Sequence, residues 1–138
     1  MKIQDIMNAN VETISPDATT KVAARTMHDK HIGSLPVVNE NQELVGIITD
    51  RDICCKVVAT GRDAGWTKVH EIMHKEVVTC FEDQEIADAA DLMADQHIHR
   101  LAVINRDNSL SGVLSVDDIA KGSYDLAGVV LEASAALH

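Results

Sequence analysis

The sequence predicts a mixed α/β (α+β) protein that contains two copies of one β-α-β-β-α unit. The copies are recognised by three stretches that recur in the same order. These are "DIM" at 5–7 and "EIM" at 71–73, "HIGSLPVVN" at 31–39 and "HIHRLAVIN" at 97–105, and "LVGIITDRDI" from Leu44 and "LSGVLSVDDI" from Leu110. The offset is constant at 66 residues (97 − 31 and 110 − 44), and roughly a third of the aligned positions are identical. Such a repeat indicates one supersecondary unit used twice.

Each copy is expected to begin with a short strand and a helix. The strands are predicted at Val11–Ile14 and Val77–Cys80, and each runs into a polar turn, "SPD" or "FED". The helices that follow carry apolar side chains at helical spacing, which predicts one buried face on each. These side chains are Val22, Ala23 and Met27 in the first copy and Ile86, Ala89, Ala90 and Met93 in the second.

Two more strands and a second helix complete each copy. The strands are predicted at Leu35–Val38, Leu44–Thr49, Leu101–Asn105 and Leu110–Ser115. The turns between them, "NENQE" and "RDNS", are short, which favours antiparallel hairpins. The second helix is expected to start near Asp50 or Val116 and to point Ile53 or Ile119 into the core.

We divide the chain into a first repeat at 1–60, a linker at 61–69, a second repeat at 70–122 and a helical tail at 123–138. Thr67 is expected to cap the helix that leads into "VHEIM". The tail repeats apolar residues at helical spacing, and two interpretations stay open: a helix packed on its own domain, or a dimerisation helix. The apolar residues are Leu126, Val130, Ala133 and Leu137.

Composition excludes several classes of function. A formal net charge of −10 and only 2% aromatic residues argue against nucleic-acid binding, which needs basic surface and stacking side chains. The first ten residues contain no apolar stretch typical of a secretion signal, and no apolar run is long enough to span a membrane. Three cysteines, an odd number without framework spacing, favour reduced thiols and a cytoplasmic location.

The two strand ends carry the most informative pattern. "GIITDRDI" and "GVLSVDDI" share a glycine, two aliphatic residues, a hydroxyl residue and, three positions later, an aspartate. One interpretation is helix capping by Thr49 or Ser115 with Asp52 or Asp118 in the first turn. The other is a ligand edge, because a hydroxyl can hydrogen-bond a phosphate and a carboxylate can accept hydrogen bonds from ribose hydroxyls. Both together suit an adenine nucleotide.

These motifs make the chain resemble a tandem CBS-domain pair, named after the regulatory module of cystathionine β-synthase. The resemblance covers residues 1–122 and rests on "DIM", "HIGSLPVVN" and "GIITDRDI" with their second copies. It implies a pseudo-twofold pair of units with two ligand clefts, binding of AMP, ADP, ATP or a related adenosyl ligand, and frequent assembly into homodimers. NAD and S-adenosylmethionine share the adenosine and stay open as ligands.

The resemblance also implies which residues meet the ligand, because each cleft of the family takes the hydroxyl–Asp motif from one repeat and the hairpin start from the other. The first cleft is then expected to hold Thr49, Arg51, Asp52, Val77, Val78, His99 and Arg100. The second is expected to hold Ser115, Asp117, Asp118, Val11, Glu12, Gly33 and Ser34.

The two sets differ in charge. Asp117 stands where the first repeat has Arg51, and Gly33–Ser34 stand where the second repeat has His99–Arg100. A phosphate carries up to two negative charges, and one unit charge at ~4 Å contributes about 4 kcal/mol at an effective dielectric of ~20, before desolvation is subtracted. We therefore expect the Asp52 set to bind nucleotide phosphate, with Arg51 and Arg100 as counter-charges. The Asp118 set is expected to bind weakly, to stay empty or to suit a less charged adenosine derivative.

The remaining reactive residues give no catalytic or metal prediction. The histidines form close pairs, such as His97 with His99 and His70 with His74, whereas a zinc site needs three or four convergent ligands. Cys54 and Cys55 are interpreted as buried structural residues, with a redox switch as the alternative. Because no nucleophile with a base and an orienting group is recognisable, we expect no enzyme.

The function predicted from sequence is a stand-alone regulatory module that binds an adenine nucleotide and signals by a change of conformation or assembly. An unidentified regulated protein and a homodimer are its expected partners. The alternative is a constitutive protein-interaction or dimerisation module whose ligand clefts are vestigial. A metal-dependent or redox enzyme is a third class, for which the sequence offers little.

Overall fold

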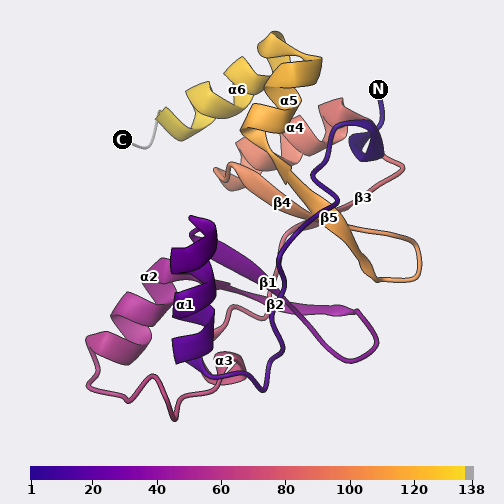
Figure 1. Cartoon of the computed structure of the whole chain (residues 1–138). Coiled ribbons are helices and arrows are strands. Elements are labelled where there is room, and N and C mark those ends of the chain that lie inside the picture. The colour runs from indigo at the N-terminus through magenta and orange to yellow at the C-terminus, as the bar shows by residue number, and fades with distance from the viewer. Residues whose placement is uncertain (136–138) are drawn as a thin grey trace. The chain divides into compact units, whose positions relative to one another are not determined.

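The computed structural model describes residues 1–135, and the chain forms two compact units. Unit 1 combines Met1–Val11 with Val78–His138, and unit 2 is Glu12–Val77. Both units mix helices with a small sheet, so the predicted α+β class with two repeats is confirmed (Figure 1). The boundaries at 60, 69 and 122, which divide the sequence into repeats, linker and tail, stay a prediction.

Unit 2 consists of one antiparallel hairpin and the helices that pack with it. Its elements are α1 (Thr20–Lys30), β1 (Ser34–Val38), β2 (Leu44–Thr49), α2 (Asp50–Ile53), the π-helical η2 (Cys54–Val58) and α3 (Val69–Ile72). The core packs Ala23 and Met27 of α1 against Leu35, Val37 and Ile48 of the hairpin. The expected hairpin and the start of the helix at Asp50 are confirmed.

Unit 1 repeats this arrangement and adds a C-terminal helix. Its elements are the 3-10 turn η1 (Ile3–Asp5), β3 (Thr79–Phe81), α4 (Ile86–Gln96), β4 (Arg100–Ile104), β5 (Leu110–Ser115), α5 (Val116–Gly122) and α6 (Tyr124–Ala135). In its three-stranded sheet β3 pairs parallel with β4, and β4 pairs antiparallel with β5. All four apolar side chains predicted for the buried face of α4 are buried.

The hairpins and helix ends are built alike in the two units, which explains the recurring sequence. The side chains of Asn39 and Asn105 each accept two backbone N–H groups of their own turn. Helices α1 and α4 both end at a histidine in the left-handed conformation, His31 with φ 56° and His97 with φ 55°. Such a residue ends a helix because its backbone N–H satisfies the last carbonyls.

Two predicted features of the first repeat are wrong. Val11–Ile14 is not a strand, because only Ile14 reaches the sheet, through an isolated parallel bridge to Val37. Val22 does not belong to the buried face of α1: it is 51% exposed, whereas Ala23 and Met27 are buried. The second repeat has a real strand at the equivalent place, β3, which starts two residues later than predicted.

The segments that precede the repeats are exchanged between the units. Residues 1–8, which contain "DIM", pack in unit 1, where Asn8 bridges to Val113 of β5. The "EIM" segment packs in unit 2, where His74 bridges to Ile47 of β2. Figure 1 shows the N-terminal segment running alongside β5. Each unit is therefore completed by a stretch that lies before the other repeat in sequence.

A glycine in each hairpin makes room for the exchanged segment. A Cβ atom at Gly46 would lie 2.6 Å from Met73 Sδ and 2.8 Å from the His74 carbonyl oxygen. A Cβ atom at Gly112 would lie 2.5 Å from the Asn8 carbonyl oxygen. Real side chains do not approach so closely, so glycine is required at both positions by packing.

Helix α6 packs against α4 and α5 of its own unit (Figure 1). Its buried residues are Ala127, Val130 and Ser134. Of the expected apolar positions, Val130 is fully buried, Leu126 is partly buried, and Leu137 lies outside the described residues. Helix α6 therefore packs on its own unit, as the first interpretation predicts, and its role in dimerisation stays a prediction.

Candidate functional site

Thr49 and Asp52 form a reciprocal cap at the junction of β2 and α2. The Asp52 backbone N–H donates to Thr49 Oγ1 at 3.1 Å, and the Thr49 N–H donates to Asp52 Oδ2 at 2.9 Å. The hydroxyl residue and the aspartate three positions later therefore satisfy two backbone donors at the start of the helix. The capping role predicted from sequence is confirmed, and it fixes where both side chains lie.

The second carboxylate oxygen of Asp52 faces the side chains of Lys56 and His74. Lys56 Nζ lies 3.0 Å and His74 Nε2 lies 2.9 Å from Asp52 Oδ1. The Asp52 side chain is only 5% exposed, whereas those of Lys56 and His74 are 43% and 55% exposed. A nearly buried carboxylate with two partners at one oxygen is held firmly, while its partners reach the surface.

These contacts set the pKa of Asp52 below its ordinary value. Burial alone raises the pKa, because it disfavours the charged carboxylate. The Thr49 backbone N–H, the Lys56 ammonium, the Thr49 hydroxyl and the His74 ring lower it by a larger combined amount. Asp52 therefore stays ionised at neutral pH and can accept hydrogen bonds.

The second repeat builds the same cap with fewer partners. Asp118 N–H donates to Ser115 Oγ at 3.1 Å, and Ser115 N–H donates to Asp118 Oδ2 at 2.9 Å. The nearest cation to Asp118 Oδ1 is Lys121 Nζ, at 3.7 Å, and the Asp118 side chain is 15% exposed. This oxygen is thus more open than the equivalent oxygen of Asp52.

The sequence reasoning missed Lys56 and His74 as neighbours of the aspartate. Their equivalents 66 positions away (56 + 66 and 74 − 66) are Gly122 and Asn8, so the pairing occurs in only one repeat. A comparison of charged residues between the repeats would have drawn attention to both. His74 lies beyond the end of α3 and therefore shares no helix face with His70.

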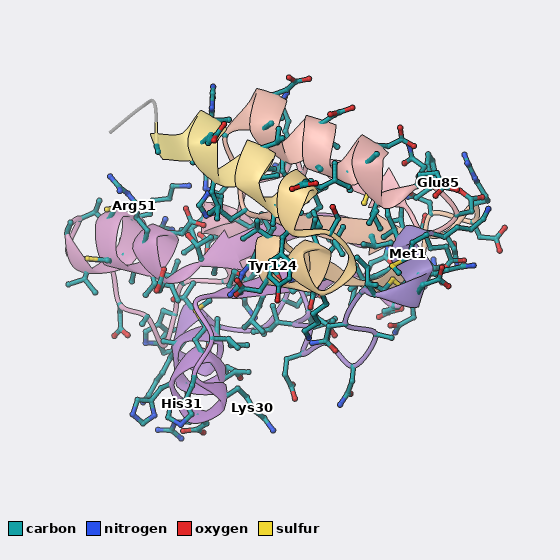
Figure 2. All side chains as sticks on the ribbon, turned by 90° about the horizontal axis from the view of Figure 1, so that it is seen from above. Met1, Lys30, His31, Arg51, Glu85 and Tyr124 are labelled. Atoms are coloured by element: carbon teal, nitrogen blue, oxygen red, sulfur yellow. The ribbon has the colours of Figure 1, made fainter. Side chains whose placement is uncertain are left out.

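The start of each hairpin lies beside the cap of its own unit. Ser34 pairs with Thr49 in unit 2, and Arg100 pairs with Ser115 in unit 1. The His99 carbonyl accepts the Val116 backbone N–H at 2.9 Å. Arg51 in unit 2 is exposed at the start of α2 (Figure 2).

The residues expected beside the first strands are less closely tied to the caps. Val11, Val77 and Val78 are half-buried, and Glu12 is an exposed partner of Lys30 at 3.5 Å. The structure thus joins each aspartate to its hydroxyl residue and its hairpin. Each ligand set implied by the family draws on residues of both units, and its composition stays a prediction.

Unit 2 also carries a shallow surface groove between α1 and α2. Its volume is about 280 Å³, and it is lined by Ala24, Met27, His28, Ile32, Asp50 and Ile53. The sequence predicts that Ile53 points into the core, but this residue is only half-buried and lines the groove. The equivalent helices α4 and α5 of unit 1 are covered by α6.

Other reactive side chains are dispersed. Residues 1–135 contain no group of three or more His, Cys, Asp or Glu side chains arranged to hold a metal ion. Cys54 and Cys55 are exposed, so their interpretation as buried residues is wrong, whereas burial raises the pKa of Cys80 to about 11. The prediction that Thr67 caps α3 is wrong. The Thr67 hydroxyl donates to the Asp63 carbonyl, and Lys68 is the N-cap residue of α3.

None of the helices in residues 1–135 has both the length and the apolar character needed to cross a membrane.

The repeated caps and hairpins are matched by a known protein family. The family described as "CBS domain" matches residues 3–58 and 69–125. The chain belongs to the CBS domain family. It is 39% identical over 118 residues to the CBS domain-containing protein YhcV of Bacillus subtilis, which covers 86% of this chain and 82% of that protein.

Solved structures of CBS pairs share the fold. The CBS domain pair of protein MJ0100, in complex with 5'-methylthioadenosine and S-adenosyl-L-methionine, is 28% identical with a TM-score of 0.75 over 88% of this chain and 94% of that one. CBSX2, in complex with AMP, is 22% identical with a TM-score of 0.77 over 91% of this chain and 97% of that one. The second likeness shows the fold alone.

Proposed function

We propose that this CBS pair is a regulatory module that binds an adenine nucleotide of the AMP, ADP or ATP type. The observation that carries the proposal is the cap formed by a hydroxyl residue and an aspartate at the end of both β2 and β5. A carboxylate fixed in this way can accept hydrogen bonds from ribose hydroxyls, and the hydroxyl beside it can donate to a phosphate. The adenosyl ligands of the MJ0100 pair support the same class of ligand.

Charge favours the Asp52 motif as the phosphate-binding one. Arg51, Lys56 and His74 all lie near this motif, whereas Asp117 and Lys121 flank Asp118. We propose the complete contact set as Thr49, Arg51, Asp52, Val77, Val78, His99 and Arg100, with the Asp118 set weaker. Because Lys56 and His74 already occupy Asp52 Oδ1, a ribose hydroxyl has to share that oxygen with them or replace one.

The same observation favours a second candidate, a constitutive interaction module. Asp52 is fully paired by the chain's own Thr49, Lys56 and His74, so the fold needs no ligand to satisfy it. In that case the cap is purely structural and the ligand sites are vestigial. No nucleotide would then change the thermal stability of the protein.

A thermal-shift titration distinguishes the two candidates. The chelator-treated protein is titrated with AMP, ADP, ATP, NAD and S-adenosylmethionine. A ligand that binds only the folded state stabilises it by about 2.7 kcal/mol at a hundredfold excess over Kd. A rise with an adenine nucleotide supports the regulatory module and identifies the ligand, and no rise with any of the five supports the interaction module.

Assembly and output belong to the same proposal. We propose a homodimer whose stability or shape changes with the nucleotide, because a ligand shifts a population toward the state that it binds better. Sedimentation velocity with and without AMP measures this change. The regulated protein and the cytoplasmic location stay predictions, as does the absence of enzymatic activity, which a hydrolysis assay on ATP and ADP tests.

A further inference from the structure

A buried hydroxyl of the C-terminal helix holds the ring of His99. Ser134 Oγ lies 2.7 Å from His99 Nε2, and Ser134 is only 8% exposed. Ser134 follows Ala127 and Val130 at helical spacing, so a polar residue occupies the stripe that packs on the unit 1 core. A hydroxyl at such a position is costly without a partner, and His99 is its partner.

The hydroxyl of Ser134 has a different partner from that of Thr26 in α1. Thr26 donates to the carbonyl four residues earlier, on Val22 of its own helix. Within residues 1–135, the partner of the Ser134 hydroxyl is the His99 ring. The hydroxyl thus shares a hydrogen bond with Nε2, and the direction of that bond depends on which ring nitrogen carries the proton.

That hydrogen bond has a consequence for the histidine. A neutral imidazole carries one proton, and the hydrogen bond made by one ring nitrogen decides which nitrogen holds it. If Nε2 accepts from Ser134, the proton resides on Nδ1. His99 then offers an N–H donor next to Arg100, the exposed residue that begins β4.

We infer that Ser134 is a positioning residue that fixes His99 as an Nδ1–H donor for an anionic phosphate oxygen of the ligand. The inference rests on the proposed function and adds to it a contribution from α6, most of which lies beyond the matched CBS domain, 69–125. Helix α6 then affects how strongly the protein favours a charged nucleotide over a neutral nucleoside.

Ring nitrogens of histidine can be observed directly. A long-range ¹H–¹⁵N spectrum of the full chain, recorded at about pH 8, distinguishes the protonated nitrogen from the unprotonated one. His99→Gln identifies the signals of His99. We expect the Nδ1–H form in the wild type, a mixture of forms in Ser134→Ala, and recovery of the wild-type form in Ser134→Thr.

Ligand selectivity provides the second measurement. Calorimetry with AMP and with adenosine compares the wild type, Ser134→Ala and Ser134→Thr. Loss of one well-placed hydrogen bond to phosphate should weaken AMP binding by about three- to tenfold in Ser134→Ala and leave adenosine within about twofold. Thr26→Ala removes a helical hydroxyl that does not contact His99, and it should change neither affinity.

The outcomes separate this inference from the proposed function. An unchanged His99 tautomer in Ser134→Ala, or an equal loss of AMP and adenosine affinity, overturns the role of Ser134 while the regulatory function stands. If the wild type binds neither ligand, the proposed function fails and the phosphate role of His99 fails with it. The spectra then still decide whether Ser134 sets the tautomer.

Discussion

The two units share one fold but treat their aspartates differently. Asp52 is 5% exposed and pairs with Lys56 and His74, whereas Asp118 is 15% exposed and has Lys121 at 3.7 Å. Both aspartates cap a helix through the same two hydrogen bonds. The two repeats thus share the cap but differ in the charges around it. The cap alone therefore explains the shared residues, and a difference in ligand binding has to come from the surrounding charges.

The largest change in the free energy of unfolding is expected where the exchanged segments pack against the two hairpin glycines. Gly112→Ala should destabilise the protein by about 3 kcal/mol and Gly46→Ala by about 2 kcal/mol, as overpacking does. The added methyl at 112 meets the Asn8 backbone, and that at 46 meets the Met73 side chain first, which can move more easily. Urea denaturation measures both changes.

Gly128→Ala serves as the matched control. An added Cβ at Gly128 has no atom within 4 Å, and the residue lies inside α6. Alanine there should stabilise the helix by up to about 1 kcal/mol. Equal losses in all three variants would show that the exchanged segments do not explain the two hairpin glycines.

Removal of the aspartates sharpens the comparison of the two caps. Asp118→Ala should lower the free energy of unfolding by about 1 kcal/mol, the usual cost of a lost cap. Asp52→Ala should cost about 2 kcal/mol, because it also removes the pairing of a nearly buried carboxylate with Lys56 and His74. Asp117→Ala is the control, because Asp117 is exposed. A larger loss of unfolding free energy in Asp118→Ala than in Asp52→Ala would contradict the difference between the two caps.

The pH dependence of stability isolates the contribution of Asp52. Its pKa is lower in the folded state than the ordinary value of 3.8, so its stabilising effect is complete above that value. The effect is lost as pH falls through the folded-state pKa, where Asp52 takes up a proton. The stability difference between wild type and Asp52→Ala should therefore be constant from about pH 6 to 5 and shrink below about pH 4. A difference that grows on acidification would show that the assigned direction is wrong.

Thiol reactivity gives the smallest expected effect, because it leaves stability unchanged. Cys54 and Cys55 of unit 2 are exposed, whereas Cys80 of unit 1 is buried and its pKa is raised to about 11. A disulfide reagent at about pH 8 should label the first two rapidly, since the thiolate is the reactive form. Cys80 should react only after unfolding, and rapid labelling of Cys80 in the folded protein would contradict its burial.

Repetition made much of the fold predictable from sequence. The hairpins, α4 and the starts of α2 and α5 follow from patterns that occur twice, so each copy supports the other. Val11–Ile14 failed because its residues have strand-like composition but only Ile14 reaches the sheet. Val22 failed because it lies just beside the narrow buried stripe of α1.

The candidate site was only partly predictable. The cap of Thr49 and Asp52 follows from local spacing, whereas the contact of His74 with Asp52 depends on the exchanged segment, which local spacing does not reveal. Ser134 was missed for a related reason. The predicted stripe of α6 was centred on Leu126 and Ala133, and the buried one contains Ala127 and Ser134.

Calorimetric titration with AMP of the wild type, Asp52→Asn and Asp118→Asn shows which of the two aspartates binds the ligand. Asparagine keeps an oxygen for the cap and removes the charge, so folding is disturbed less than by alanine. We expect AMP to bind the wild type, Asp52→Asn to weaken binding more than about tenfold, and Asp118→Asn to change it little. Binding that is lost only in Asp118→Asn, or no binding by the wild type, would contradict this expectation.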